Sequence, residues 1–247
     1  HHEYFISVAF RSAKAASCAS VAMHKGAIIL RGLLIASLST VVTCCTYASD
    51  QIPGAPQQQP IAITGAVIHT MTGKEIENGV VVFEAGKFTV VGKRGDIPEG
   101  AEILEATGKH LYPSLIDANT DIGLVEINSI RATIDSREIG NMNPNVRAAA
   151  AFNPDSELIP VNRANGILLA LSAPTGGTLA GRSSLMMLAG WTWEDMTLQA
   201  DTGMHIRWPR DNKQLTELET ILEQAARYRA SRANSELLPL DLRLEAL

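Results

Sequence analysis

The stretch that decides the fold runs from residue 108 to residue 124 and reads GKHLYPSLIDANTDIGL. Pro113 breaks a short apolar run, and residues 114–118 then form a second apolar run of the length of a buried strand. Polar side chains follow at once, Asn119 and Asp121 among them. A buried strand that ends in polar side chains is typical of an α/β barrel, which carries its catalytic groups at the carboxyl ends of its strands. The stretch therefore predicts a strand with a candidate site directly after it.

The same stretch resembles a segment of the amidohydrolase superfamily that closes a small β-sandwich and opens a metal-dependent barrel. The family pattern is G-x-x-x-x-P-G-[LF]-I-D-x-H-x-H, and the positions that match it are Gly108, Pro113, Leu115, Ile116 and Asp117. Ser114 stands where the family has glycine, and Asn119 and Asp121 stand where it has two metal-binding histidines. The resemblance implies an α/β fold, with a small N-terminal β-sandwich followed by an incomplete (β/α)8 TIM barrel.

Composition and resemblance together predict four segments. Residues 1–48 form a signal segment, residues 49–60 a linker rich in proline and glutamine, residues 61–110 part of the sandwich, and residues 111–247 the first part of the barrel. A complete barrel takes about 250 residues, so we expect at most about half of one here. A half barrel leaves strand edges and an apolar interior uncovered, which favours self-association.

The signal segment predicts export to the periplasm or out of the cell. Basic residues precede an apolar run at 32–42, and residues 46–48 resemble a small-residue cleavage site. The run is short for a bilayer span of about 20 residues, so we expect no stable transmembrane span. A cysteine pair at 44–45 leaves a lipoprotein as an alternative, although the preceding residues are a poor match to a lipidation motif.

The overall composition argues against a nucleic-acid partner, and the resemblance implies a small-molecule substrate. The chain has a net charge of −5 and only 5% aromatic residues, so it offers neither a basic face for phosphates nor a stacking platform for bases. The three cysteines all lie within the first 45 residues. No disulfide framework or thiolate metal site is therefore available to the rest of the chain.

Short strand-like runs follow the linker at intervals of about ten residues, as in a sandwich or small barrel. Residues 80–92 predict a β-hairpin with a tight turn at Ala85-Gly86. His69 and His110 fall in this region, and we interpret both as histidines of the sheet or of its strand ends rather than as ligands.

A second buried strand is predicted at residues 167–172, followed by a glycine-rich loop over residues 173–184. The substrate-binding candidates in this loop are Thr175, Gly176, Gly177 and Arg182. Backbone N–H groups of such a loop can hold an anion, but an irregular loop that needs glycine for its conformation is the structural alternative. The segment 165–196 resembles the imidazolonepropionase-like branch of the amidohydrolases. His205 lies in a later short strand and is expected to pack, and residues 211–234 predict an amphipathic helix.

The chemistry implied by the resemblance is metal-dependent hydrolysis of non-peptide carbon–nitrogen bonds, with a divalent, zinc-type metal that activates water. Asn119 removes one good ligand, whereas Asp121 could still bind a metal through oxygen. Residues 119–121 therefore form either a variant mononuclear site or a strand end that lost its metal, and we favour the second. Three hypotheses stay open: an incomplete exported hydrolase, a metal-free binding protein that uses the loop at 174–184, and an inactive fragment.

Overall fold

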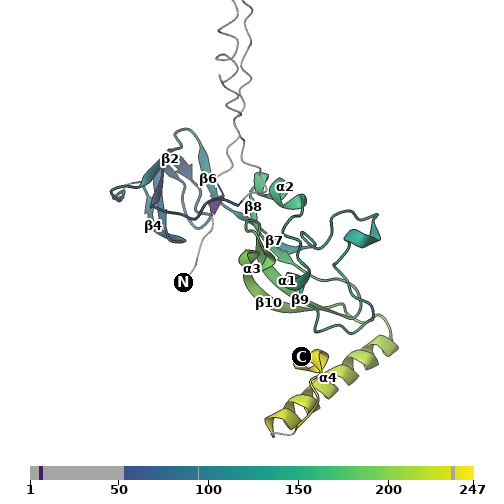
Figure 1. Ribbon diagram of the computed structural model, residues 1–247. Helices are drawn as coiled ribbons and strands as arrows, with labels where there is room; N and C mark the ends of the chain where they lie inside the picture. Colours follow the sequence, from purple (N-terminus) through teal and green to yellow (C-terminus); the bar gives the residue numbers. More distant parts are fainter. Residues whose placement is uncertain (1–5, 8–52, 94, 235–236) are drawn as a thin grey trace, which may run out of the picture. The chain divides into compact units, whose positions relative to one another are not determined.

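The computed structural model of the chain describes residues 6–7, 53–93, 95–234 and 237–247 (Figure 1). The predicted signal segment lies outside these residues except for positions 6 and 7, and all three cysteines lie outside them. The described strands form one sheet of six strands and one of four. Within the described ranges, no helix has both the length and the apolar character that a bilayer crossing requires.

The first sheet contains the strand-rich region that follows the linker. Its strands pair in the order β1-β6-β2-β3-β4, and β5 pairs with β2. The pairing is mixed, because β5 and β6 run parallel to β2 whereas β3 runs antiparallel to it. The strands are β1 (Ile6–Ser7), β2 (Ile61–Ile68), β3 (Ile76–Glu84), β4 (Lys87–Gly92), β5 (Glu102–Glu105) and β6 (His110–Pro113). The predicted segment boundary at residue 110 thus falls within β6.

The hairpin predicted at residues 80–92 is confirmed by β3 and β4. These strands are antiparallel and pair Glu84 with Lys87 across a two-residue turn. Ala85 and Gly86 both have positive φ angles, 48° and 74°, as a tight hairpin turn requires. The buried core of this sheet consists of Ile63, Ala66, Ile68, Val81, Ala106 and Leu111.

The second sheet begins with the strand that the opening stretch predicted. Strands β7 (Leu115–Thr120) and β8 (Ile167–Ser172) are parallel, with Leu115 opposite Ile167 and Thr120 opposite Ser172. Both predicted strands are thereby confirmed, and they are parallel. The prediction that residues 114–118 form a buried strand is wrong, because Leu115 and Ile116 of β7 are 60% and 57% exposed. Strands β9 (Leu179–Met187) and β10 (Thr197–Ile206) complete the sheet in the order β10-β9-β8-β7.

Strands β9 and β10 make the second sheet mixed, because each pairs antiparallel with its neighbour. The prediction of a loop over all of residues 173–184 is wrong, since β9 already begins at Leu179. Residues 179–181, 183 and 184 are buried, and buried backbone groups require hydrogen-bond partners, which β8 and β10 supply. Strand β10 is also longer than the short strand predicted around His205.

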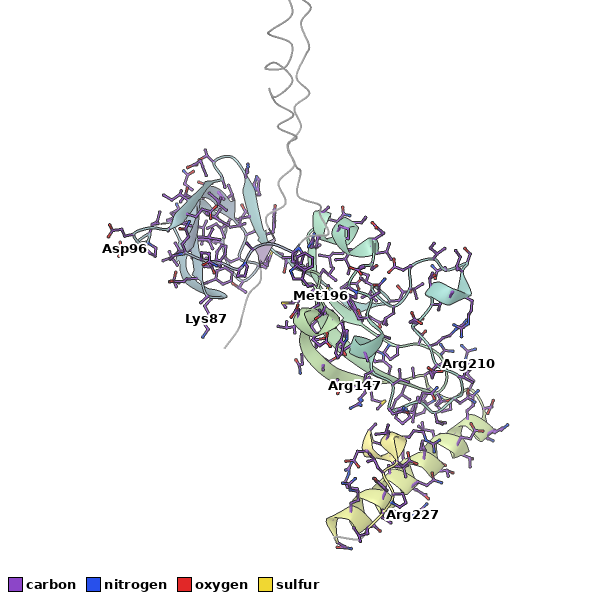
Figure 2. All side chains as sticks on the ribbon, viewed as in Figure 1. Lys87, Asp96, Arg147, Met196, Arg210 and Arg227 are labelled. Atoms are coloured by element: carbon purple, nitrogen blue, oxygen red, sulfur yellow. The ribbon has the colours of Figure 1, made fainter. Side chains whose placement is uncertain are left out.

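Short helices cover the second sheet and contribute to its core (Figure 1). Besides the 3-10 turn η1 (Arg131–Thr133), they are α1 (Ala148–Ala151), α2 (Leu158–Ala164) and α3 (Trp193–Met196). The core comprises Ile122, Ala149, Phe152, Ile159, Ala170, Met186, Leu188 and Met196, the last labelled in Figure 2. Trp193 packs against this core, whereas Trp191 is largely exposed.

The predicted C-terminal helix is confirmed as α4 (Asn212–Ala233), and α5 (Leu242–Glu245) follows it. Asp211 caps α4, because the Gln214 N–H donates to Asp211 Oδ1 at 2.8 Å. The buried side chains of Leu218 and Ile221 in α4 form a cluster with Leu179 of β9. This cluster secures the start of β9, where the candidate site lies.

Candidate functional site at the strand ends of the second sheet

A hollow of about 170 Å³ lies at one edge of the second sheet. We call it the strand-end hollow, and its lining consists of Asn119, Pro174, Thr175, Gly176, Gly177, Ala180, His205, Ile206 and Arg207. Four of the positions singled out from the sequence, at 119 and 175–177, are therefore brought together here. Arg182 and Asp121 are not part of the lining.

Strand direction explains why these residues meet. Strands β7 and β8 are parallel, and β10 runs in the same direction because two antiparallel pairings separate it from β8. Asn119 therefore stands at the carboxyl end of β7, the loop 174–177 leaves the carboxyl end of β8, and His205 stands at that of β10. Open α/β sheets bind their ligands at this edge.

The loop at residues 174–177 is held open by backbone geometry. Both Gly176 and Gly177 have positive φ angles, 90° and 66°. The backbone O of Asn141 accepts hydrogen bonds from Thr178 and Leu179 N–H at 2.8 and 2.9 Å. A Cβ on Gly177 would lie 2.7 Å from that same oxygen, so only glycine fits here. Within the described part of the chain, the N–H groups of Gly176 and Gly177 have no acceptor.

The polar groups of the hollow favour an anion. Arg207 is the one residue of the lining with a permanent charge, and the described lining residues include no Asp or Glu. The Arg207 N–H donates to Thr178 O at 2.9 Å, which fixes its backbone beside the loop. Its guanidinium makes no ion pair with the described residues. Unpaired donors without a neighbouring carboxylate are the arrangement that holds carboxylates and phosphates.

The donor set of this edge does not fit a hydrolytic metal centre. Such a centre takes three protein ligands, commonly histidine and carboxylate, and no group of three His, Cys, Asp or Glu residues among those described could hold an ion. The Asn119 amide is a poor ligand, and Asp121 is exposed. The nearby Asp117 Oδ1 accepts from the Asn119 N–H at 3.4 Å instead.

Arg182 serves the sheet rather than the hollow. It lies within β9, and its Nη1 pairs with Asp201 Oδ2 at 3.2 Å. Arg147, labelled in Figure 2, pairs with the other oxygen of Asp201 through Nε at 3.0 Å. Asp201 has a positive φ angle of 54°, in a register shift of β10. One carboxylate thus joins two arginines on two different elements.

Sequence reasoning missed two members of the site. His205 was expected to pack, and Arg207 was not considered. The signal that could have found them is their place at the end of a strand before Pro209, because strand ends on the ligand-binding edge carry the polar groups. Recognising that edge requires the direction of β10, which depends on its pairing with β9.

No protein-family model and no curated protein matches the sequence. Among solved structures, the chain is similar to an amidohydrolase from Thermotoga maritima MSB8, with a TM-score of 0.70 and 22% sequence identity. The match covers 75% of this chain and 54% of that one, so this chain spans about half the length of the amidohydrolase. This likeness shows the fold, a mixed α/β arrangement similar to that of an amidohydrolase.

A second solved structure is more distant. It is a prolidase in complex with N-methylphosphonate-L-proline, with a TM-score of 0.28 and 15% identity over 45% of this chain and 25% of that one. A TM-score this low supports no structural argument.

Proposed function

We propose that this chain binds a small organic anion in the strand-end hollow, without a metal ion, on a scaffold of the amidohydrolase type. The observation that carries the proposal is the composition of the lining. It combines Arg207 with a glycine loop whose N–H groups have no acceptor in the described part of the chain, and none of its described residues is acidic. A carboxylate or phosphate would complete these donors.

The division of roles follows from the chemistry of each group. The Arg207 guanidinium provides charge and a planar fork of donors. The N–H groups of Gly176 and Gly177 provide fixed dipoles that need no rearrangement on binding. Asn119 and His205 offer polar groups to the remainder of the ligand. At about 170 Å³ the hollow is smaller than the roughly 300 Å³ at which drug-sized pockets begin, so the ligand is small.

A second candidate function is hydrolysis of a non-peptide carbon–nitrogen bond by a protein of this fold, and the TM-score of 0.70 to an amidohydrolase favours it. This proposal includes a small β-sandwich followed by part of a barrel, the imidazolonepropionase-like branch, a zinc-type metal and export. It requires metal ligands that the described residues do not supply. The strand-end hollow would then hold the anionic end of the substrate.

The test of the anion site is a matched pair of arginine variants of the full chain, titrated with N-acetylglycine by calorimetry. Arg207→Gln should weaken binding about 10- to 100-fold, because a charge-assisted hydrogen bond contributes about 1.5–3 kcal/mol. Arg210→Gln is the control, since Arg210 is an exposed neighbour outside the hollow (Figure 2). Equal affinity of both variants for the probe would refute the assignment of Arg207.

A further inference from the structure

The first sheet carries a chain of three hydrogen-bonding side chains that the proposed function does not use. His69 Nδ1 lies 3.0 Å from Glu75 Oε1, and His69 Nε2 lies 2.8 Å from His110 Nδ1. Tyr112 stacks on the His69 ring, with a centroid distance of 4.1 Å and an interplanar angle of 6°. Two imidazole nitrogens therefore face each other beside a carboxylate.

Strand pairing fixes the two histidines. Strands β2 and β6 are parallel, with Val67 opposite His110. The N–H of Val67 donates to Lys109 O, and the N–H of His69 donates to Leu111 O, both at 2.9 Å. These bonds lie on either side of His110, so the backbones that carry both imidazoles are held in register.

The carboxylate selects the tautomers that fit two neutral imidazoles. A carboxylate only accepts hydrogen bonds, so His69 Nδ1 carries the proton and His69 Nε2 presents a lone pair. His110 Nδ1 must then donate to that lone pair. His110 is exposed, whereas the His69 side chain is only 13% exposed.

We propose that His69 and His110 together bind a divalent transition-metal ion of the kind that prefers imidazole, such as Cu²⁺ or Zn²⁺. The ion takes the place of the shared proton between His69 Nε2 and His110 Nδ1, and the His110 proton moves to Nε2 by exchange with water. Glu75 keeps its hydrogen bond to His69 Nδ1, the arrangement in which a carboxylate orients a metal-binding imidazole.

The geometry requires the two nitrogens to part and the rings to turn by roughly 35° each, so that both lone pairs point at the ion. Zinc–nitrogen bonds of about 2.0–2.1 Å at a tetrahedral angle place the two nitrogens roughly 3.3 Å apart. The present separation is 2.8 Å, so the nitrogens must part by about 0.5 Å, which the exposed His110 side chain can provide. With two protein ligands, the other coordination positions are left to water. The site therefore differs from a centre with three protein ligands, for which no suitable group of side chains exists among the described residues.

The test is calorimetric titration of the full chain with ZnCl₂ and with CuCl₂ alone. The unaltered chain should bind one equivalent of metal ion at this site, and we expect His69→Ala and His110→Ala each to lose that equivalent. Glu75→Gln should weaken that equivalent by about 10- to 100-fold, as loss of an outer carboxylate does elsewhere. His205→Ala is the matched control and should keep the equivalent. Subtraction between variants removes any contribution from histidines and cysteines of the N-terminal segment.

If a variant is destabilised, imidazole spectra of the unaltered chain test the proposal instead. Proton–nitrogen correlation spectra of the imidazoles should show zinc shifting Nε2 of His69 and Nδ1 of His110, while Nδ1 of His69 keeps its proton. Unchanged imidazole signals at saturating zinc would overturn the proposal. Retention of the full metal equivalent by folded His110→Ala protein would overturn it as well.

Discussion

The two sheets carry opposite chemistry next to their strands, since His69 directly follows β2 and His110 begins β6, whereas the polar groups of the second sheet lie at carboxyl ends. In the first sheet, parallel strands bring His69 and His110 to 2.8 Å of each other, with Glu75 behind them. In the second sheet, three strands that run in the same direction end in an amide, a glycine loop and an arginine, with His205 as the one imidazole of the hollow. The first is a set of metal-preferring donors, and the second is a set of anion-preferring donors.

This difference shows that the strands of a sheet can be kept while the polar side chains next to them change. The opening stretch keeps the apolar residues that build β7 and pair it with β8, and the fold remains similar to that of an amidohydrolase. The positions directly after those apolar residues, 119 and 121, carry Asn and Asp instead of the histidines of the family pattern. Backbone pairing with β8 holds this strand although Leu115 and Ile116 are exposed, whereas the side chains at its end are free to change.

The largest expected effect comes from the same substitution in both sheets. Leu179→Ala and Leu111→Ala each remove a buried leucine from a core cluster and should lower the free energy of unfolding by about 2–5 kcal/mol. Leu179→Ala should abolish anion binding but spare the histidine pair, and Leu111→Ala should do the reverse. The measurements are chemical denaturation, titration with N-acetylglycine and titration with zinc. Loss of anion binding and of metal binding in both variants would mean that the two sites are not independent.

Next in size is the carboxylate that joins Arg147 and Arg182. Asp201→Asn keeps the shape and tolerates the positive φ angle, but it removes the charge between two guanidiniums. We expect a loss of about 1.5–3 kcal/mol in the free energy of unfolding, because hydrogen bonds to charged groups contribute that much. A loss below about 0.5 kcal/mol in urea denaturation would show that the pair is fully screened by water.

A double substitution would give the second sheet the chemistry of the first. Asn119→His combined with Asp121→His places two imidazoles two residues apart, one at the end of β7 and one directly after it. We expect zinc binding at this edge to strengthen by at least tenfold, about 1.4 kcal/mol. The measurement is zinc titration in a His69→Ala background. An unchanged isotherm would show that two histidines at these positions are not sufficient to create a zinc site.

The smallest effect concerns the helix that supports the hollow. Asp211→Ala removes the cap of α4 and should lower the free energy of unfolding by about 1 kcal/mol. Asp211→Ser should restore most of it, because serine caps nearly as well. Thermal denaturation, monitored by circular dichroism, distinguishes the two variants. Equal stability of the Ala and Ser variants would mean that the cap contributes nothing.

The sequence predicted what depends on local apolar patterns and turn residues. The strand predicted at 114–118, which the structure has at 115–120, the strand at 167–172, the hairpin with its Ala85-Gly86 turn and the helix after Asp211 follow from apolar runs, turn residues and helical periodicity. The direction of β10 was not predictable, because it depends on pairing with β9, and a loop was expected over residues 173–184, where β9 begins. His69 and His110 were expected in the sheet or at its strand ends, but their contact spans 41 positions and follows from the parallel pairing of β2 and β6.

The most direct test of metal-free anion binding in the strand-end hollow is one calorimetric titration, carried out in excess EDTA. N-acetylglycine is compared there with its neutral amide, which has the same shape without the charge. We predict saturable 1:1 binding of the acid, an affinity for the amide at least tenfold weaker, and the same acid affinity with and without EDTA. Loss of acid binding in EDTA, or equal binding of acid and amide, would contradict the account.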